Sequence, residues 1–269
     1  MASTTPAPKT SSWCGVGVVP ARSKRLTTKQ MARHREPVTM SVPDWDNEGV
    51  REGTRKMLDL RARALDRGER PIGWKLGFGA PRSMARFGLS GPLVGFLTDA
   101  TAHSPGSTVS CAGWQRPVVE PEIAVYIGSD LESGSNVAGS IAALGPALEL
   151  ADVYPPPEDL EEILAGNIFH RGVVLGEPDH SRAGAERSDL RARVLRDGYE
   201  VVDTSDLATN TGDLVEIVAH CATLLGTAGA RLAAGEVVII GSVIPPLAIE
   251  PGQEIEFELN PLPRISVHV

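Results

Sequence analysis

Cysteine is scarce in this sequence of 269 residues and occurs only at Cys14, Cys111 and Cys221. The three positions lie far apart, and none belongs to a C-x-x-C pair. This spacing excludes a disulfide framework and a zinc knuckle, and it is typical of a protein from a reducing compartment. Each cysteine is interpreted as a small buried or incidental residue rather than as a nucleophile.

Positive net charge and long apolar runs are missing as well. The formal net charge is -8, which argues against nucleic acid as the main partner, although a bound cation can still reverse the field around an acidic substrate. No stretch approaches eighteen uninterrupted apolar residues, so no membrane span is expected. Neither G-x-G-x-x-G nor G-x-x-x-x-G-K occurs, and no phosphate-binding glycine loop is predicted.

Acidic residues are almost absent from the first forty positions, where Glu36 is the only one. This basic segment, rich in Ser and Thr, is either a transit-type leader or an upstream extension, with Met40 as the true start. It lacks the apolar core of a secretory signal, and we expect residues 1–39 to be disordered and without chemistry. The protein is then expected to be cytoplasmic, or organellar if the leader is a genuine transit segment.

The rest of the chain has an ordinary composition, with 42% hydrophobic and 22% charged residues. Apolar periodicity and turn residues predict more strands than helices, and these do not alternate as regular βαβ units. We therefore expect one α+β domain with a β-rich core from about residue 42 to 269. The expected helices cover about 47–67, one or two turns ending at Gly88, 155–164 and 212–229. The expected strands cover 70–79, 91–97, 117–128, 167–176 and several short segments within 235–269.

The strand "PVVEPEIAVYIG", residues 117–128, carries Glu120 and Glu122 on one face, because side chains alternate along an extended chain. Val119, Ile123 and Val125 point to the other face and predict contact with a core. Two interpretations compete for the glutamates: a face in contact with water, or carboxylates that converge on something positive.

Two further charges lie within apolar runs, where a buried charge is costly unless it is paired or binds metal. Glu149 lies in "ALGPALELADV", and Lys75 lies in "PIGWKLGFG". Each could form a core salt bridge. Three carboxylates that converge require a compensating cation, and ligands that offer only oxygen favour Mg²⁺, with Mn²⁺ or Ca²⁺ as alternatives.

Five stretches in order along residues 73–269 resemble the fumarylacetoacetate hydrolase superfamily, and most of all its 2-keto-4-pentenoate hydratase and 4-oxalocrotonate decarboxylase branch. They are "GWKLGFG", "VVEPEIAVYIG", "GPALELAD", "AGNIFHRGVVLG" and the C-terminal "GEVVIIGS" to "RISVHV". The resemblance implies a mixed, β-rich sheet roll of the fumarylacetoacetate hydrolase C-terminal type, formed by a catalytic domain at 40–269. It also implies a homo-oligomer.

The resemblance also implies the functional residues. Glu120, Glu122 and Glu149 match the three ligands of a divalent cation, usually Mg²⁺, with Mn²⁺ as a second candidate. Lys75 matches the active-site lysine, and Asn167 matches a substrate-binding asparagine. The implied activity is that of a Mg²⁺-dependent lyase, a hydratase or a decarboxylase, which acts on a small 2-oxo acid through a metal-bound enolate in the catabolism of aromatic compounds.

Departures from the family pattern concern the substrate-binding residues. Leu93 stands where hydratases have an aspartate, and this apolar residue favours decarboxylation. Ile168 and Phe169 stand where the family has small or hydroxyl residues. His170 is a further candidate for substrate contact, or else a structural residue. Hydrolysis of an acylpyruvate-like diketone and a non-catalytic metal-binding role remain the alternatives, although residues 47–70 lack the histidine that the hydrolases carry.

Overall fold

The computed structural model describes residues 44–132 and 135–269. Contacts divide the chain into two units, Met1–Met40 and Ser41–Val269, and every described residue belongs to the second unit. The predictions for residues 1–39 and for Cys14 lie outside the described residues. Cys111 and Cys221 are both buried free cysteines.

Helix α1 (Glu48–Asp66) begins where its sequence predicts. The side chain of Asn47 caps the helix by accepting hydrogen bonds from the backbone N–H groups of Gly49 and Val50. Its buried face packs on helix α4 (Leu160–Ala165), and a side chain at Gly53 would collide with Leu164. The other helices are α2 (Pro81–Phe87), α3 (Val137–Ser140) and α5 (Leu214–Thr227).

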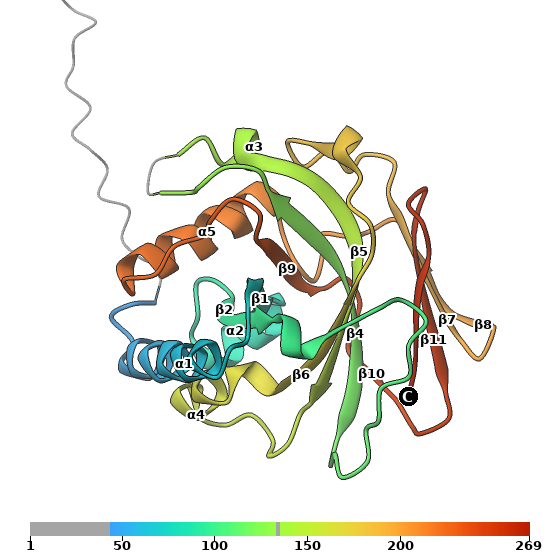
Figure 1. Ribbon diagram of the computed structural model, residues 1–269, viewed down its shortest axis with the longest axis horizontal. Helices are drawn as coiled ribbons and strands as arrows, with labels where there is room; N and C mark the ends of the chain where they lie inside the picture. The colour runs from blue at the N-terminus through green and yellow to red at the C-terminus, as the bar shows by residue number, and fades with distance from the viewer. Residues whose placement is uncertain (1–43, 133–134) are drawn as a thin grey trace, which may run out of the picture. The chain divides into compact units, whose positions relative to one another are not determined.

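An eight-stranded mixed sheet forms the centre of the fold, in the order β2-β1-β9-β4-β5-β6-β3, with β10 paired to β4. The β1–β9 and β3–β6 pairs are parallel, and the other pairs are antiparallel. The sheet curls (Figure 1), and buried residues of α1 and α5 join the same apolar cluster as Val119, Ile123 and Val125 of β4. Its strands are β1 (Pro71–Gly77), β2 (Leu93–Thr98), β3 (Ala102–His103), β4 (Pro117–Ile127), β5 (Ile141–Asp152), β6 (His170–Leu175), β9 (Val237–Ser242) and β10 (Leu247–Ala248).

A second, antiparallel sheet packs against β5 on the outer side of the curled sheet, in the order β12-β11-β7-β8. Its strands are β7 (Arg191–Arg196), β8 (Tyr199–Thr204), β11 (Glu254–Asn260) and β12 (Ile265–His268). The main apolar cluster contains residues of both sheets and extends to the buried residues of α1 and α5. The short C-terminal strands were expected, whereas the β7–β8 hairpin was not.

Strand β4 shows the alternation that its sequence predicts. Val119, Ile123 and Val125 are fully buried in the main apolar cluster. Ala124 and Tyr126 point to the opposite face and join a separate apolar cluster. One face of β4 is therefore fixed by the core, and its glutamates are held on the inner face of the curl.

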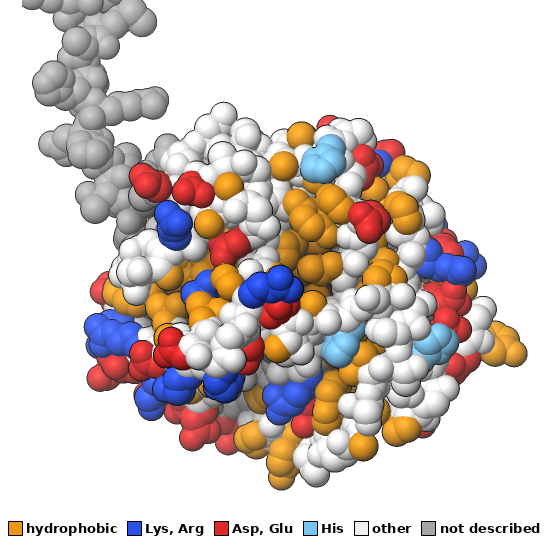
Figure 2. Space-filling model, viewed as in Figure 1, with side chains coloured by type: hydrophobic (Ala, Val, Ile, Leu, Met, Phe, Trp, Pro, Cys, Tyr) orange, Lys and Arg blue, Asp and Glu red, His pale blue; other side chains and the backbone are white. Residues whose placement is uncertain are grey.

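The surface and the helices add two observations. On the face shown in Figure 2, charged side chains gather over α1 and α4, while apolar side chains gather towards the centre, over the curled sheet. Within residues 44–132 and 135–269, no helix is both long enough and apolar enough to cross a membrane.

Candidate metal centre

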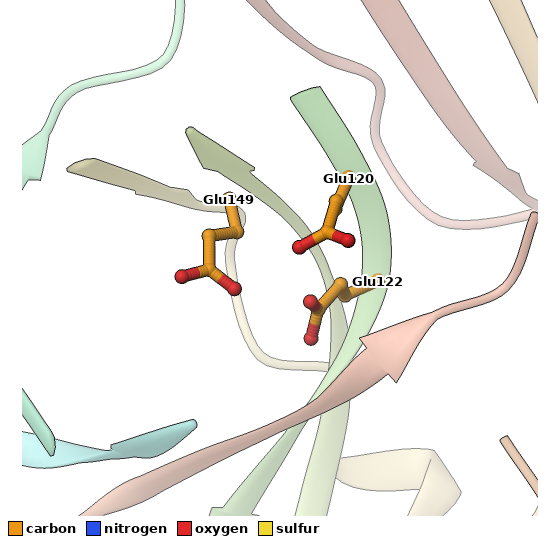
Figure 3. Close-up of side chains that lie close together, drawn as sticks. All are labelled: Glu120, Glu122 and Glu149. Carbon is orange, nitrogen blue, oxygen red and sulfur yellow. The ribbon is translucent and has the colours of Figure 1, made fainter. Parts of the chain in front are cut away.

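Three glutamates converge on the inner face of the curled sheet. Glu120 and Glu122 lie on β4, and Glu149 lies on the neighbouring β5, directly opposite Glu120 in the antiparallel pairing. One carboxylate oxygen from each of the three lies within 4.8 Å of the others. Figure 3 shows the three carboxylates turned toward a common space between the strands. The convergence expected from the sequence is therefore present, and a face in solvent contact is excluded for the fully buried Glu122 and Glu149.

In each of the two buried glutamates, one carboxylate oxygen has a hydrogen-bond partner and the other has none. Oε2 of Glu122 accepts a hydrogen bond from the backbone N–H of Gly241 (2.8 Å), while its Oε1 has no partner. Oε1 of Glu149 accepts from Lys75 and is 2.8 Å from Nδ1 of His170, while its Oε2 has no partner. A buried carboxylate oxygen without a partner is costly. Hard cations such as Mg²⁺ and Ca²⁺ take oxygen ligands, so these residues fit a divalent ion.

Burial and mutual repulsion set the protonation of this cluster. Burial, reinforced by the charge of Glu149, raises the pKa of Glu120 to about 7. The pKa of Glu122 is raised well above its ordinary value by burial and then by the two neighbouring carboxylates. Burial alone would raise the pKa of Glu149, but the Lys75 ammonium and the His170 hydrogen bond outweigh it and hold the pKa below its ordinary value. Glu149 is therefore the carboxylate that stays charged most readily.

Lys75 is 1% exposed on β1 and reaches this cluster. Its ammonium forms an ion pair with Glu149 and donates a second hydrogen bond to the backbone carbonyl of Ile168 (3.2 Å). It also lines the cavity that opens beside Glu120. The ion pair was one of the two interpretations of this lysine, and its catalytic role stays a prediction.

A left-handed turn at Asn167–Phe169 brings the Ile168 carbonyl to Lys75. The φ angles of Asn167, Ile168 and Phe169 are 53°, 51° and 63°. The left-handed region is unfavourable for a β-branched residue such as Ile168, so the backbone here is strained. The sequence predicts a strand from residue 167. That prediction is wrong for these three positions, since β6 begins at His170.

The side-chain amide of Asn167 forms its hydrogen bonds with the backbone of β2. Its Oδ1 accepts from the N–H of Phe96 (2.8 Å), and its Nδ2 donates to the carbonyl of the same residue (3.0 Å). His170 is buried, with Nδ1 near Glu149 and Nε2 3.0 Å from the hydroxyl of Thr101. Both residues line a hollow that shares no described residue with the cavity at Lys75 and Glu120. Their expected contact with substrate stays a prediction.

The cavity at Lys75 and Glu120 has a volume of about 180 Å³. Phe78, Ile168 and Phe169 contribute to its wall, whereas Leu93 does not line it. Leu93 instead packs in a buried cluster with Val50 and Ile168. The apolar wall that the sequence suggests is therefore present, but other residues than Leu93 form it.

Sequence reasoning missed the backbone groups that complete the site. Gly241 has a φ of 92° and donates its N–H to Glu122, and the Ile168 carbonyl accepts from Lys75. The glycine that interrupts the apolar run "VVIIGS" was the available signal, because a glycine inside a strand often marks a close backbone approach. For the turn at 167–169 the only such signal is Asn167, because asparagine adopts positive φ angles more often than most residues.

Residues 75–269 match the family model described as fumarylacetoacetate (FAA) hydrolase C-terminal. The chain belongs to the fumarylacetoacetate hydrolase family. Within it, the chain is 30% identical over 216 residues to a 4-oxalocrotonate decarboxylase of Pseudomonas putida, a match that covers 77% of this chain and 81% of the relative. It is 26% identical over 244 residues to a 2-hydroxyhexa-2,4-dienoate hydratase of Comamonas testosteroni, a match that covers 88% of this chain and 91% of the relative.

Solved structures of this family have the same fold. A 4-oxalocrotonate decarboxylase from Pseudomonas putida G7, complexed with calcium and acetate, has a TM-score of 0.71 and 25% identity, and the match covers 79% of this chain and 82% of that one. A structure of the enzyme with magnesium and adipate has a TM-score of 0.75 at 23% identity, covering 84% and 88%. The expected sheet roll is confirmed.

Proposed function

We propose that the protein is a Mg²⁺-dependent lyase that acts on a small 2-oxo acid. The observation that carries this proposal is the pair of buried, partnerless oxygens on Glu122 and Glu149, two glutamates that converge with Glu120 beside a small cavity. The family relatives support it, because they include lyases of this kind, and one is solved with magnesium. Mn²⁺ fits the same oxygen ligands.

Each residue of the site has a distinct part in the proposed reaction. Glu120, Glu122 and Glu149 would hold the cation, which when bound supplies positive charge that polarises the keto group and stabilises the enolate. Lys75 faces the same cavity and carries the only ammonium among its described walls, so it is the candidate to donate or accept the proton that moves. Phe78 and Phe169 give that cavity apolar walls, against which the carbon chain of a substrate would pack.

Hydration of a 2-oxo-enoate and decarboxylation of a 2-oxo dioate both fit this set of residues. The argument for decarboxylation from the side chain of Leu93 has no support in the geometry, because Leu93 does not line the cavity. The proposal therefore rests on the shared lyase chemistry rather than on that residue.

Calorimetry with Mg²⁺, alone and with oxalate as an enolate mimic, tests the site directly. The wild type should bind Mg²⁺, and Glu149→Gln should lower the affinity by roughly tenfold or more. Glu177→Gln, a change at an exposed glutamate, serves as the matched control. Activity is then measured on 2-hydroxypenta-2,4-dienoate and 2-oxohex-3-enedioate, with and without EDTA. A wild type that binds neither Mg²⁺ nor Mn²⁺ contradicts the proposal.

The net charge of -8 and the small cavity favour a small molecule over nucleic acid as the partner. A homo-oligomer and a cytoplasmic location stay predictions. Light scattering on the purified protein and fractionation of the cells that express it test them.

A further inference from the structure

The cavity beside the carboxylates is small and mostly apolar. Its volume of about 180 Å³ lies below the roughly 300–1,000 Å³ of sites for drug-sized ligands, so it suits a short acid. Among the described residues that line it, the polar side chains are those of Lys75, Ser83 and Glu120. The apolar part of the wall includes Phe78, Val153, Pro157, Ile168, Phe169 and Pro246.

Positive charge is confined to one end of this cavity. Lys75 is the only lysine, arginine or histidine among the described residues that line it, and its ammonium already contacts Glu149 and the Ile168 carbonyl. A 2-oxo acid would place its carboxylate and keto oxygens at this charged end, beside the glutamates. The rest of the substrate then extends along Phe78 and Phe169.

No other cation among the described residues lines this cavity: Arg86 donates its hydrogen bond to the carbonyl of Pro157 (2.7 Å), and two further arginines line different hollows. Arg116 is exposed and lines a neighbouring hollow of about 540 Å³, which shares Val153 and Pro246 with the cavity but also contains Glu250. Arg67 lines the separate hollow that contains His170. A second carboxylate held inside the small cavity would lose hydration without a cation among the described lining residues beside it, and an unpaired buried charge is strongly unfavourable.

Resting on the proposed function of the carboxylate site, we propose that the substrate is a 2-oxo monocarboxylic acid with a short, uncharged, apolar tail, and that the cavity discriminates against 2-oxo dioates of the same length. Phe78, Val153, Ile168 and Phe169 are then the residues that determine specificity. This class of substrate selects hydration of an enoate, because loss of CO₂ from the far end of a dioate requires the second carboxylate that the cavity disfavours.

A matched pair of ligands tests the proposal. 2-Oxohexanoate and 2-oxoadipate have the same number of carbon atoms and the same 2-oxo acid group, and they differ only in the terminal methyl or carboxylate group. We expect the Mg²⁺-loaded protein to bind 2-oxohexanoate at least tenfold more tightly in calorimetry. Oxalate, which has no tail, reports on the carboxylate site alone.

The outcomes separate the two proposals. If oxalate does not bind, the proposed function fails, and the substrate class fails with it. If oxalate binds but 2-oxoadipate binds as tightly as 2-oxohexanoate, or more tightly, only the substrate class is overturned. Loss of that 2-oxoadipate binding in Arg116→Gln would then place the second carboxylate in the neighbouring hollow.

A change of charge at Val153 gives an independent test. Val153 is partly exposed and lines the cavity, so Val153→Lys would bring an ammonium to the apolar part, and Val153→Met adds similar length without charge. We expect Val153→Lys to shift the preference at least tenfold toward 2-oxoadipate and Val153→Met to keep the wild-type preference. Thermal melting verifies that both variants fold. An unchanged preference in Val153→Lys would show that the tail does not lie in this cavity.

Discussion

Lys75 balances the charge of a buried glutamate and is also the candidate for proton transfer. Its buried ammonium lies between the Glu149 carboxylate and the Ile168 carbonyl. We expect Lys75→Met to lower turnover by on the order of a hundredfold, the usual contribution of one acid-base group. We also expect a lower melting temperature without metal, because Glu149 would lose its buried partner. The measurement is kcat in saturating Mg²⁺ together with thermal melting.

Lys56→Met is the matched control for this change. Lys56 is exposed and pairs with Glu161 on the surface, so its loss should leave both turnover and melting temperature nearly unchanged. Turnover of Lys75→Met within a fewfold of wild type would show that this lysine serves only to balance charge.

Glu120 gives the metal-free protein a predictable pH dependence. Burial and Glu149 raise its pKa to about 7 in the folded state, above an ordinary value of 4.5. The folded state thus binds the proton more tightly than the unfolded chain does. The resulting stabilisation is fully present below about pH 4.5 and is lost as the pH rises through about 7. The raised pKa of Glu122 acts in the same direction.

Histidines titrate in the same pH range, so the wild type is compared with Glu120→Gln. The difference in stability between the two proteins then reports the contribution of Glu120 alone. At pH 5 the neutral Glu120 resembles glutamine, and the two proteins should melt at similar temperatures without metal. At pH 8 the variant should be the more stable by roughly 1–3 kcal/mol. A difference between the two that stays constant from pH 5 to pH 8 would contradict the assignment.

At the scale of elements, the left-handed turn at 167–169 joins the site to β2. The amide of Asn167 satisfies both backbone groups of Phe96, and Gly95 leaves the room it needs, since a Cβ there would lie 2.6 Å from Asn167 Oδ1. We expect Asn167→Ala to destabilise the protein by about 1–3 kcal/mol, because it leaves buried backbone groups unpaired. Urea denaturation measures this, with Asn260→Ala at an exposed position as control. Equal midpoints for the two variants would contradict the assigned role.

The elements also show where prediction from sequence succeeds. β4 was predictable because a side-chain period of two, with Val119, Ile123 and Val125 on one face, leaves only the opposite face for the glutamates. The end of α2 was predictable because Gly88 adopts the left-handed conformation that closes helices. The turn at 167–169 was not, because only Asn167 in "NIF" belongs to a residue type that favours positive φ angles, and Ile disfavours them.

At the scale of the whole molecule, metal binding and folding should be coupled. Bound Mg²⁺ at a hundred times its Kd adds about 2.7 kcal/mol of stability. For a domain of this size, that corresponds to a rise in melting temperature of roughly 5–10 °C. Differential scanning calorimetry with Mg²⁺ and then with EDTA should show this rise and its reversal.

Glu122→Gln tests whether the stabilisation comes from this site. A glutamine at this position can still accept the Gly241 hydrogen bond, so the variant changes the ligand more than the packing. It should fold and lose most of the Mg²⁺-dependent rise. The full rise in this variant would place the ion elsewhere.

The long-range arrangement was the least accessible to sequence. The resemblance predicted the sheet roll, but the β7–β8 hairpin and its packing through the second sheet depend on pairing with the distant β11. Likewise, the ion pair between Lys75 and Glu149 joins β1 to β5, two strands that are not neighbours in the sheet. Local patterns identify such charges as costly, yet the curl of the sheet decides which of them meet.

The direct opposition of Glu120 and Glu149 has a consequence for the alignment of their strands. Because successive side chains of a strand point to opposite faces, a slip of β5 by one residue would carry Glu149 to the face that packs against the second sheet. A misaligned chain could then not bring the three carboxylates together. Binding of a divalent ion therefore indicates that β4 and β5 are paired correctly. A one-residue deletion within β5 ahead of Glu149 should abolish this binding, whereas the connection between the two strands can change in length.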